Sequence, residues 1–241
     1  MTSLSVMVFL AAVLLSPFLA NCQGSTFADL STTLIQVQTE IINKHNELRR
    51  AVSPQASNML KMWDKEAAAN AQKWANKCVY KHSDPKRTNI SCGENLFMSS
   101  APLLWSHGIQ SWYDEEKDFV YAVGPKSPGA VIGHYTQLVW ATSHRLGCAV
   151  AYCPNQSVLK YFYVCQYCPA GNYVNRKYYP YKQGPPCSSC PGYCDNGLCT
   201  NGCNYENVYS NCGNLKTMLT CKHELVKNNC KASCNCAGKI Y

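Results

Sequence analysis

Cysteine is the residue type whose chemistry stands out in this sequence. The chain has 17 cysteines in 241 residues, and thiols in such numbers either pair as disulfides or bind a metal as thiolates. The first 22 residues carry no Asp, Glu, Lys or Arg, and residues 6–15 form an apolar run too short to span a bilayer. We therefore expect residues 1–22 to be a signal peptide. Cleavage after Cys22 would leave 16 of the 17 cysteines, which predicts eight disulfides in an oxidising compartment.

The alternative chemistries have weaker signals. Structural zinc–thiolate sites need facing Cys-x-x-Cys pairs in a reducing cell, and a secretory signal argues against that setting. A hydrolase needs a nucleophile such as Ser near a His, or a metal-bound water with a general base. The sequence has neither Gly-x-Ser-x-Gly nor His-Glu-x-x-His. Because a site assembled from distant residues escapes such motifs, a metal-dependent hydrolase stays a minor alternative to a protein that is not an enzyme.

Charge and glycosylation signals agree with secretion. The formal net charge is +8, and the Lys and Arg residues are scattered along the chain, which is typical of a solvated surface and argues against a nucleic-acid partner. The sequons at Asn89 and Asn155 are expected glycosylation sites. No segment after the signal approaches 18 apolar residues. We expect an extracellular monomer without a transmembrane segment.

Cysteine density divides the chain into two parts. Six cysteines lie between residues 23 and 184, and ten lie between Cys187 and Cys236. The first part is long enough to bury a core of its own, whereas about 50 residues at the end need cross-links to stay folded. Pro180, Pro185 and Pro186 mark the boundary because they disfavour regular structure.

Hydrophobic periodicity places the elements that must position any site. In the first part it predicts four helices followed by two strands, which gives an α+β domain. The helices are expected over residues 34–48, 64–78, 105–112 and 133–140, and the strands over 146–152 and 159–167. In the cysteine-rich part, two short helices are expected near residues 215–219 and 223–227.

Three passages match the motifs of a known superfamily. They are Cys-Gly-Glu-Asn-Leu at Cys92–Leu96, Gly-His-Tyr-Thr-Gln-Leu-Val-Trp at Gly133–Trp140, and Tyr-Val-Cys-Gln-Tyr-Cys-Pro-Ala-Gly-Asn-Tyr at Tyr163–Tyr173. They resemble the CAP superfamily. With the ten-cysteine segment, the chain after the signal resembles the cysteine-rich secretory proteins (CRISPs), and Cys199-Thr-Asn-Gly-Cys203 looks most similar to the mammalian reproductive and exocrine members.

The resemblance implies a domain plan and a disulfide pattern. It implies an α-β-α sandwich CAP domain at residues 23–180, a disulfide hinge at 181–202, a mostly helical six-cysteine module at 203–236 and a C-terminal tail at 237–241. The module resembles the ShK-type toxin fold of sea-anemone potassium-channel blockers. The implied pairs are Cys78–Cys153, Cys92–Cys168, Cys148–Cys165, Cys187–Cys194, Cys190–Cys199, Cys203–Cys236, Cys212–Cys230 and Cys221–Cys234.

The resemblance also implies a cleft in the CAP domain. The family places two histidines and two glutamates there, and the matching residues are His82, Glu94, Glu115 and His134. Two imidazoles that converge could bind a divalent metal such as Zn²⁺, while carboxylates ligate it or orient a ring. The rival interpretation is a polar cluster that organises the fold, with no cofactor required.

For function, the resemblance implies regulatory binding in a reproductive or exocrine fluid, with roles in sperm maturation, sperm–egg interaction and ion-channel modulation. The expected partner is a cell-surface protein or ion channel. Lys222 and Lys227 are the candidate surface of the module, but no Tyr or Phe neighbours them as in a pore-blocking toxin, and they could equally be a solvated helix face. A sterol or lipid carrier is the alternative. Trp105, Trp112 and Trp140, which could line its groove, are more often core residues at this spacing.

Overall fold

A three-stranded antiparallel sheet is the centre of the larger region. The structure is a computed structural model that describes residues 26–62, 66–84 and 91–241. The expected signal peptide and the sequon at Asn89 lie outside the described residues. The strand order is β1-β5-β4, and the strands are β1 (Gly93–Ser99), β4 (Arg145–Tyr152) and β5 (Tyr161–Cys168).

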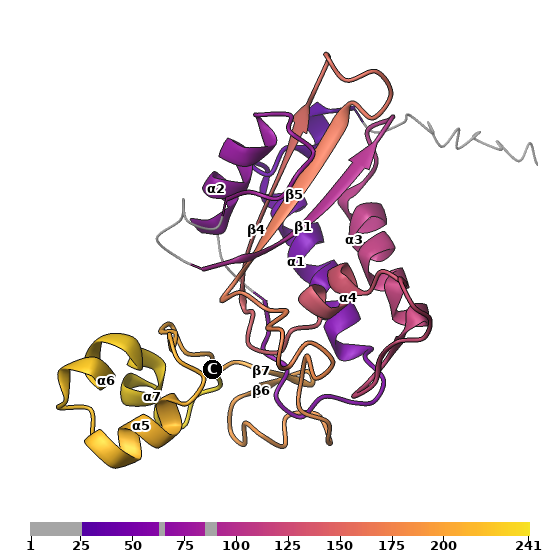
Figure 1. Cartoon of the computed structure of the whole chain (residues 1–241). Coiled ribbons are helices and arrows are strands. Elements are labelled where there is room, and N and C mark those ends of the chain that lie inside the picture. The colour runs from indigo at the N-terminus through magenta and orange to yellow at the C-terminus, as the bar shows by residue number, and fades with distance from the viewer. Residues whose placement is uncertain (1–25, 63–65, 85–90) are drawn as a thin grey trace, which may run out of the picture.

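Helices cover both faces of this sheet (Figure 1). One face packs against α2 (Glu66–Ala75), and the other packs against α1 (Ile35–Arg50), α3 (Trp105–Tyr113) and α4 (Gly133–Leu138). Side chains alternate along β4, so that Val150 joins the core under α1 and α3 while Ala149 packs under α2. At Gly147, a Cβ would lie 2.0 Å from the backbone nitrogen of Ala68. A glycine there lets α2 approach the sheet closely.

The α+β fold class expected from the sequence is confirmed. The four helices and two strands of the larger region lie within three residues of the expected bounds. The sequence pattern missed β1, because Gly93–Ser99 has no strict alternation of polar and apolar residues. It also missed the short hairpin of β2 (Phe119–Val120) and β3 (Gly124–Pro125), which is too brief to leave a periodic signal.

A buried arginine ties α1 to the loop after α4. Arg49 is 1% exposed, and its guanidinium donates hydrogen bonds to four backbone carbonyls, with burial lowering its pKa to about 9. The acceptors are Leu60, Leu138, Trp140 and Ala141, at 2.7–3.1 Å. Full hydrogen bonding offsets much of the cost of burying this charge. The end of α4 is thereby fixed relative to α1.

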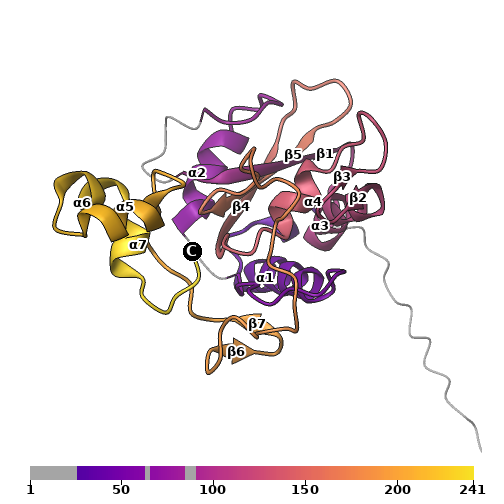
Figure 2. The same ribbon diagram turned by 60° about the horizontal axis from the view of Figure 1, so that its bottom comes forward.

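The segment after residue 180 is built onto the larger region. The β6 (Cys194–Asp195) and β7 (Leu198–Cys199) hairpin lies beside the end of α1 (Figure 2). The Cys199 N–H donates to the Met59 carbonyl at 2.7 Å, and the Lys61 N–H donates to the Cys199 carbonyl at 2.9 Å. Leu198 is fully buried in the main core. The hairpin is therefore anchored in the core of the larger region.

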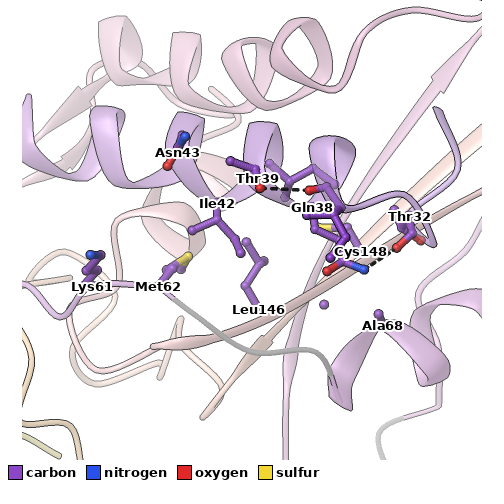
Figure 3. Close-up of a pocket in the computed structure, with 13 residues that line it drawn as sticks. Thr32, Gln38, Thr39, Ile42, Asn43, Lys61, Met62, Ala68, Leu146 and Cys148 are labelled. Carbon is purple, nitrogen blue, oxygen red and sulfur yellow. Dashed lines mark hydrogen bonds between the residues drawn. The ribbon is translucent and has the colours of Figure 1, made fainter. Parts of the chain in front are cut away.

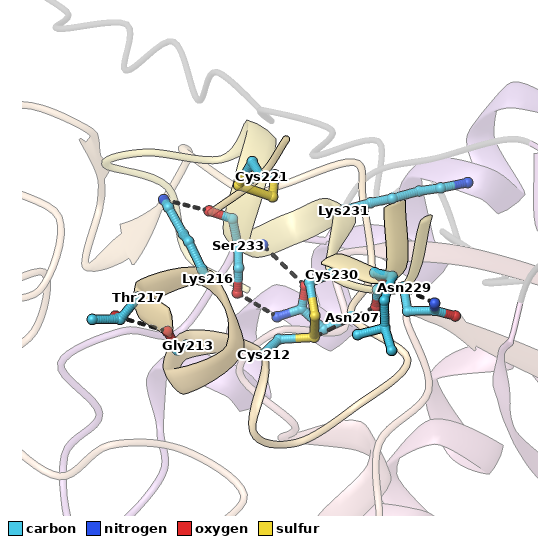
Figure 4. Close-up of a disulfide and its surroundings, with 12 residues drawn as sticks. Asn207, Cys212, Gly213, Lys216, Thr217, Cys221, Asn229, Cys230, Lys231 and Ser233 are labelled. Atoms are coloured by element: carbon cyan, nitrogen blue, oxygen red, sulfur yellow. Dashed lines mark hydrogen bonds between the residues drawn. A yellow bond between two sulfur atoms is a disulfide. The ribbon is translucent and has the colours of Figure 1, made fainter. Parts of the chain in front are cut away.

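The C-terminal module contains three short helices where two were expected. They are α5 (Cys212–Leu219), α6 (Glu224–Asn229) and α7 (Lys231–Asn235). The Cys212–Cys230 disulfide lies at their centre against Val226, which is fully buried (Figure 4). Near the C-terminus, Ile240 pairs with Gly202 and packs against the hinge cystines. Among the described residues, no helix has the length and apolar character needed to cross a bilayer.

Candidate functional site

His134 lies in the first turn of α4 against Glu115. Glu115 belongs to the 3-10 turn Asp114–Asp118 that follows α3. One carboxylate oxygen accepts the backbone N–H groups of His134 and Tyr135 at 2.9 and 3.1 Å, and the other lies 2.5 Å from His134 Nδ1. Negative charge is favourable at a helix N-terminus. Glu115 therefore caps α4 and fixes the orientation of the His134 ring.

His82 forms a second pair, with Glu94 on β1. Its Nδ1 lies 3.0 Å from Glu94 Oε1, and the His82 side chain is 64% exposed while that of Glu94 is 7% exposed. The hydrogen bond to Glu94 raises the pKa of His82. Burial opposes ionisation of Glu94, but hydrogen bonds from His82 and the Ser83 N–H hold the pKa of Glu94 below its usual value. A solvent-accessible imidazole is thus hydrogen-bonded to an ionised carboxylate.

Buried hydrogen bonds connect the two pairs through β1. Glu94 lies directly across from Gln166 on β5, whose amide donates to the carboxylate at 3.3 Å. The next residue, Asn95, donates to the His134 carbonyl at 3.0 Å and to the Tyr167 hydroxyl at 3.3 Å. Gln166 and Asn95 were not predicted as supports. Both lie inside CAP motifs, and this position was the sequence signal that could have identified them as part of the site.

The same network reaches α1 at His45. Its Nε2 lies 3.0 Å from the Tyr167 hydroxyl, and its Nδ1 lies 2.8 Å from the Ile41 carbonyl. Burial lowers the pKa of His45 to about 4, so the ring is neutral at neutral pH. Both ring nitrogens are occupied, and this histidine acts as a structural link and not as a ligand.

The two pairs fit a metal site only in part. Each glutamate holds Nδ1 of its histidine, which leaves Nε2 as the atom available to a metal, and this is the usual orientation of a zinc-ligating histidine. However, no three of these four residues bring ligand atoms within 4.8 Å of one another. Among the residues that the structure describes, only Cys187, Cys190 and Cys199 do so. The carboxylates therefore orient the rings and do not complete a four-residue cage.

The structure contains eight disulfides, and they are the eight pairs that the resemblance implies. Three cross-link the larger region, two lie in the hinge and three lie in the module. They join Cys78 to Cys153, Cys92 to Cys168, Cys148 to Cys165, Cys187 to Cys194, Cys190 to Cys199, Cys203 to Cys236, Cys212 to Cys230, and Cys221 to Cys234. Of the hinge cluster, Cys190 and Cys199 are bonded to each other and Cys187 is bonded to Cys194, so none of the three is a free thiolate.

Comparison with known proteins places this arrangement in a family. The model "CAP: Cysteine-rich secretory protein family" matches residues 42–167, and the model "Crisp" matches residues 187–241. Cysteine-rich secretory protein 3 of Homo sapiens is 65% identical over 100% of both chains. This chain belongs to the cysteine-rich secretory protein family. Cysteine-rich secretory protein 2 of Homo sapiens is 61% identical over 97% of both chains.

A solved structure extends the comparison to three dimensions. The structure named "Crystal structure of NaASP2 with Zn2+" matches with a TM-score of 0.58 and 33% sequence identity. The match covers 69% of this CRISP and 96% of that chain. For the cysteine-rich module, the family model at residues 187–241 is the relevant match.

The candidate binding surface of the module is exposed to solvent. Lys222 and Lys227 are both exposed, and neither lies over an aromatic ring among the described residues. Lys216 differs, because its Nζ donates to the Ser233 carbonyl at 2.7 Å inside the module (Figure 4). Asn155 is exposed in the β4–β5 loop, within a turn in which the Gln156 N–H donates to the Cys153 carbonyl.

Among the grooves formed by the described residues, two lie beside elements discussed above. One, of about 360 Å³, lies between α1 and β4, with Ile42, Met62 and Leu146 in its wall (Figure 3). The other, of about 500 Å³, lies between the CAP region and the module. The tryptophans considered for a lipid groove are core residues instead: Trp105, Trp112 and Trp140 are at most 3% exposed.

Proposed function

We propose that this CRISP is a secreted regulatory binding protein of a reproductive or exocrine fluid that acts through its module and not by catalysis. The observation that carries the proposal is an exposed stretch across the α5–α6 connection. Met218 is 78% exposed, Leu219 and Leu225 are also exposed, and Lys222 and Lys227 lie in the same stretch. A cystine-stapled module does not use these apolar side chains in its core, and gathered exposed apolar groups mark interaction sites.

The proposed partner is a cell-surface protein, with an ion channel as the specific candidate. The proposed roles are sperm maturation, sperm–egg interaction and modulation of channel currents. Neither exposed lysine lies over an aromatic ring, so the module would modulate a channel through a surface and would not plug its pore. The proposed working units are residues 1–22, 23–180, 181–202, 203–236 and 237–241, as expected from the sequence.

Current recordings from sperm cells test this proposal with the full-length protein. Wild-type protein at micromolar concentration should change the current. Met218→Ser combined with Leu219→Ser and Leu225→Ser should weaken that effect at least tenfold, because the contact surface is lost. The matched control changes three exposed apolar residues of the CAP region to Ser, namely Val123, Val131 and Val174. An unaltered current with wild-type protein, or equal loss in the control, would contradict the proposal.

Secretion and modification have direct tests. The proposal expects the secreted protein to begin at Gln23 and to carry glycans at Asn89 and Asn155. N-terminal sequencing of the secreted protein and mass spectrometry before and after glycan removal measure both. A secreted chain that still begins at Met1 would remove the signal peptide from the proposal.

We also propose that His82 and His134 bind Zn²⁺ through Nε2, with Glu94 and Glu115 as the groups that orient them. Titration calorimetry should detect Zn²⁺ binding that is lost when both histidines become Ala. His107→Ala is the control, because His107 is an exposed histidine outside these two pairs. A metal-dependent hydrolase is the weaker hypothesis for the function of these histidine–glutamate pairs. Any ester or peptide hydrolysis that survives the double change would exclude them as its site.

The groove between α1 and β4 favours a second candidate function, a sterol or lipid carrier. Its volume of about 360 Å³ is within the usual range for small-molecule sites. Ile42→Asp would place a charge in its apolar wall and should abolish binding of a fluorescent sterol, whereas Val123→Asp should not. Absence of binding by wild-type protein would end the carrier hypothesis.

A further inference from the structure

The two hinge disulfides lie unusually close to each other. The Cys187–Cys194 and Cys190–Cys199 bridges are separate bonds, yet sulfurs of Cys187, Cys190 and Cys199 all lie within 4.8 Å of one another. A sulfur of the first bridge therefore lies next to both sulfurs of the second. Thiol–disulfide exchange requires this kind of approach between an attacking sulfur and a disulfide.

The chain between these bridges already favours a different pairing. Cys187-Ser-Ser-Cys190 has the Cys-x-x-Cys spacing in which two cysteines can form a bond within one turn. That turn is present, because the Cys190 N–H donates to the Cys187 carbonyl at 3.0 Å. The Cys187–Cys190 bond is thus a feasible alternative that needs little movement of the backbone.

Accessibility gives the exchange a direction. Cys194 is exposed on β6, whereas Cys187, Cys190 and Cys199 are 9%, 1% and 0% exposed. Of these four residues, Cys194 is therefore the one that a thiol from solution reaches most readily. Attack on that sulfur makes Cys187 the leaving group, and Cys187 is the residue that lies against the second bridge.

We propose that the hinge is a thiol-reactive site at which a low-molecular-weight thiol, such as reduced glutathione, modifies Cys194 and switches the disulfide pairing. The external thiolate bonds to Cys194 Sγ, and the Cys187–Cys194 bond breaks to release the Cys187 thiolate. This thiolate bonds to Cys190 Sγ, and the Cys190–Cys199 bond breaks to release the Cys199 thiolate, which takes a proton from water. Two disulfide bonds exist before and after, so no oxidant or reductant is consumed.

The switch changes what holds the β6–β7 hairpin to the turn at Cys187–Cys190. Cys194 and Cys199 are direct partners across the β6–β7 hairpin, and each strand is bonded to the turn at Cys187–Cys190. After exchange that turn is closed on itself, and the hairpin keeps only noncovalent contacts, such as the Lys61–Asp195 ion pair at 2.5 Å. The hairpin and the module that follows it should gain freedom to move.

Disulfide mapping of the full-length secreted protein tests the proposal. The protein is incubated with graded reduced glutathione, quenched in acid, alkylated and digested without reduction. The expected product carries glutathione on Cys194, a Cys187–Cys190 link and alkylated Cys199, with the other six disulfides intact. Alkylated Cys187 beside an intact Cys190–Cys199 bond would overturn the exchange. A Cys187–Cys199 link, earlier opening of another disulfide, or no reaction would overturn it as well.

One variant and two measurements on wild-type protein complete the test, and the wild-type measurements do not depend on the folding of the variant. In the Cys187→Ser, Cys194→Ser variant, the remaining hinge bridge lacks its neighbouring nucleophile, so alkylation of Cys199 should be at least tenfold slower. In wild-type protein, intact mass should show one glutathione and one alkylated thiol per chain, and hydrogen exchange should rise at β6–β7 but not at β4 or β5. Unchanged exchange at β6–β7 would overturn the proposed loosening.

Discussion

The CAP region and the C-terminal module are held together by different forces. The CAP region buries large side chains, with Trp105, Trp140 and Tyr163 at most 1% exposed. The described core of the module consists mainly of cystine sulfurs, with Val226 and Ala232 among its few buried apolar residues. Stability of the first region therefore depends on packing, and stability of the second depends on covalent bonds.

This difference also decides where binding chemistry can lie. In the CAP region, polar groups such as the His134–Glu115 pair are fixed by a packed frame of helices around a sheet. In the module, apolar residues of a kind that is usually buried in a core, including Met218, are exposed on the surface. The CAP region is suited to a precise polar site, and the module is suited to a contact surface.

The largest expected effect comes from removing one disulfide in each region. Cys212→Ser with Cys230→Ser opens a loop of sequence separation 18, and Cys148→Ser with Cys165→Ser opens one of 17. Their loop-closure contributions are therefore alike, at about 3 kcal/mol each. The first change should unfold the module, whereas the second should leave the CAP region folded but less stable.

Hydrogen exchange at α5–α7 and at β4–β5, together with thermal unfolding, measures this contrast. A module that keeps its protected amides without the Cys212–Cys230 bond would show that it has an adequate core after all. The comparison between the two regions would then fail.

Next comes Arg49→Met, which should destabilise the packed region without unfolding either region completely. The change removes every donor to the carbonyls of Leu60, Leu138, Trp140 and Ala141. Buried acceptors left unsatisfied should cost the CAP region about 3–5 kcal/mol of unfolding free energy. Denaturant unfolding followed by tryptophan fluorescence measures this. The control is Arg50→Met, because the Arg50 side chain makes an exposed hydrogen bond to the Asn196 carbonyl. A similar loss of unfolding free energy in the control would contradict the stabilising role given to the buried Arg49.

Lowering the pH from 6.5 to 4 should reduce the unfolding free energy of the CAP region by about 3 kcal/mol relative to that of the module. The pKa of His45 is about 4 in the folded protein because of burial, against 6.5 for the free side chain. The unfolded chain therefore binds one more proton between these values, so stability is fully present above pH 6.5 and is lost as pH falls to 4. Denaturant midpoints of the CAP region across this range should fall, and His45→Gln should flatten the decline. The same steep loss in the His45→Gln protein would assign it to other groups.

The sequence predicted the two regions through different signals. Cysteine spacing marked the module, and apolar periodicity gave α1 through α4, because both are regular patterns in one dimension. Strand β1 was missed, since Gly93–Ser99 has no strict alternation of polar and apolar residues. Gln166 and Asn95 support the two histidines only because the β1–β5 register brings them there. Cross-strand neighbours of this kind are set by tertiary pairing, which a local pattern does not contain.

The smallest expected effect concerns one proton on His82. Its pKa is raised by the hydrogen bond to Glu94, so Glu94→Gln should move that pKa back toward the ordinary histidine value. NMR titration of the imidazole protons measures the shift. The control is His223, which is exposed on the module and accepts the Leu225 N–H at Nδ1, and its imidazole proton chemical shifts at one fixed pH should be the same in both proteins. If the pKa of His82 is the same with Glu or Gln at position 94, the carboxylate does not set that pKa. The comparison that assigns a precise polar site to the CAP region would then be wrong.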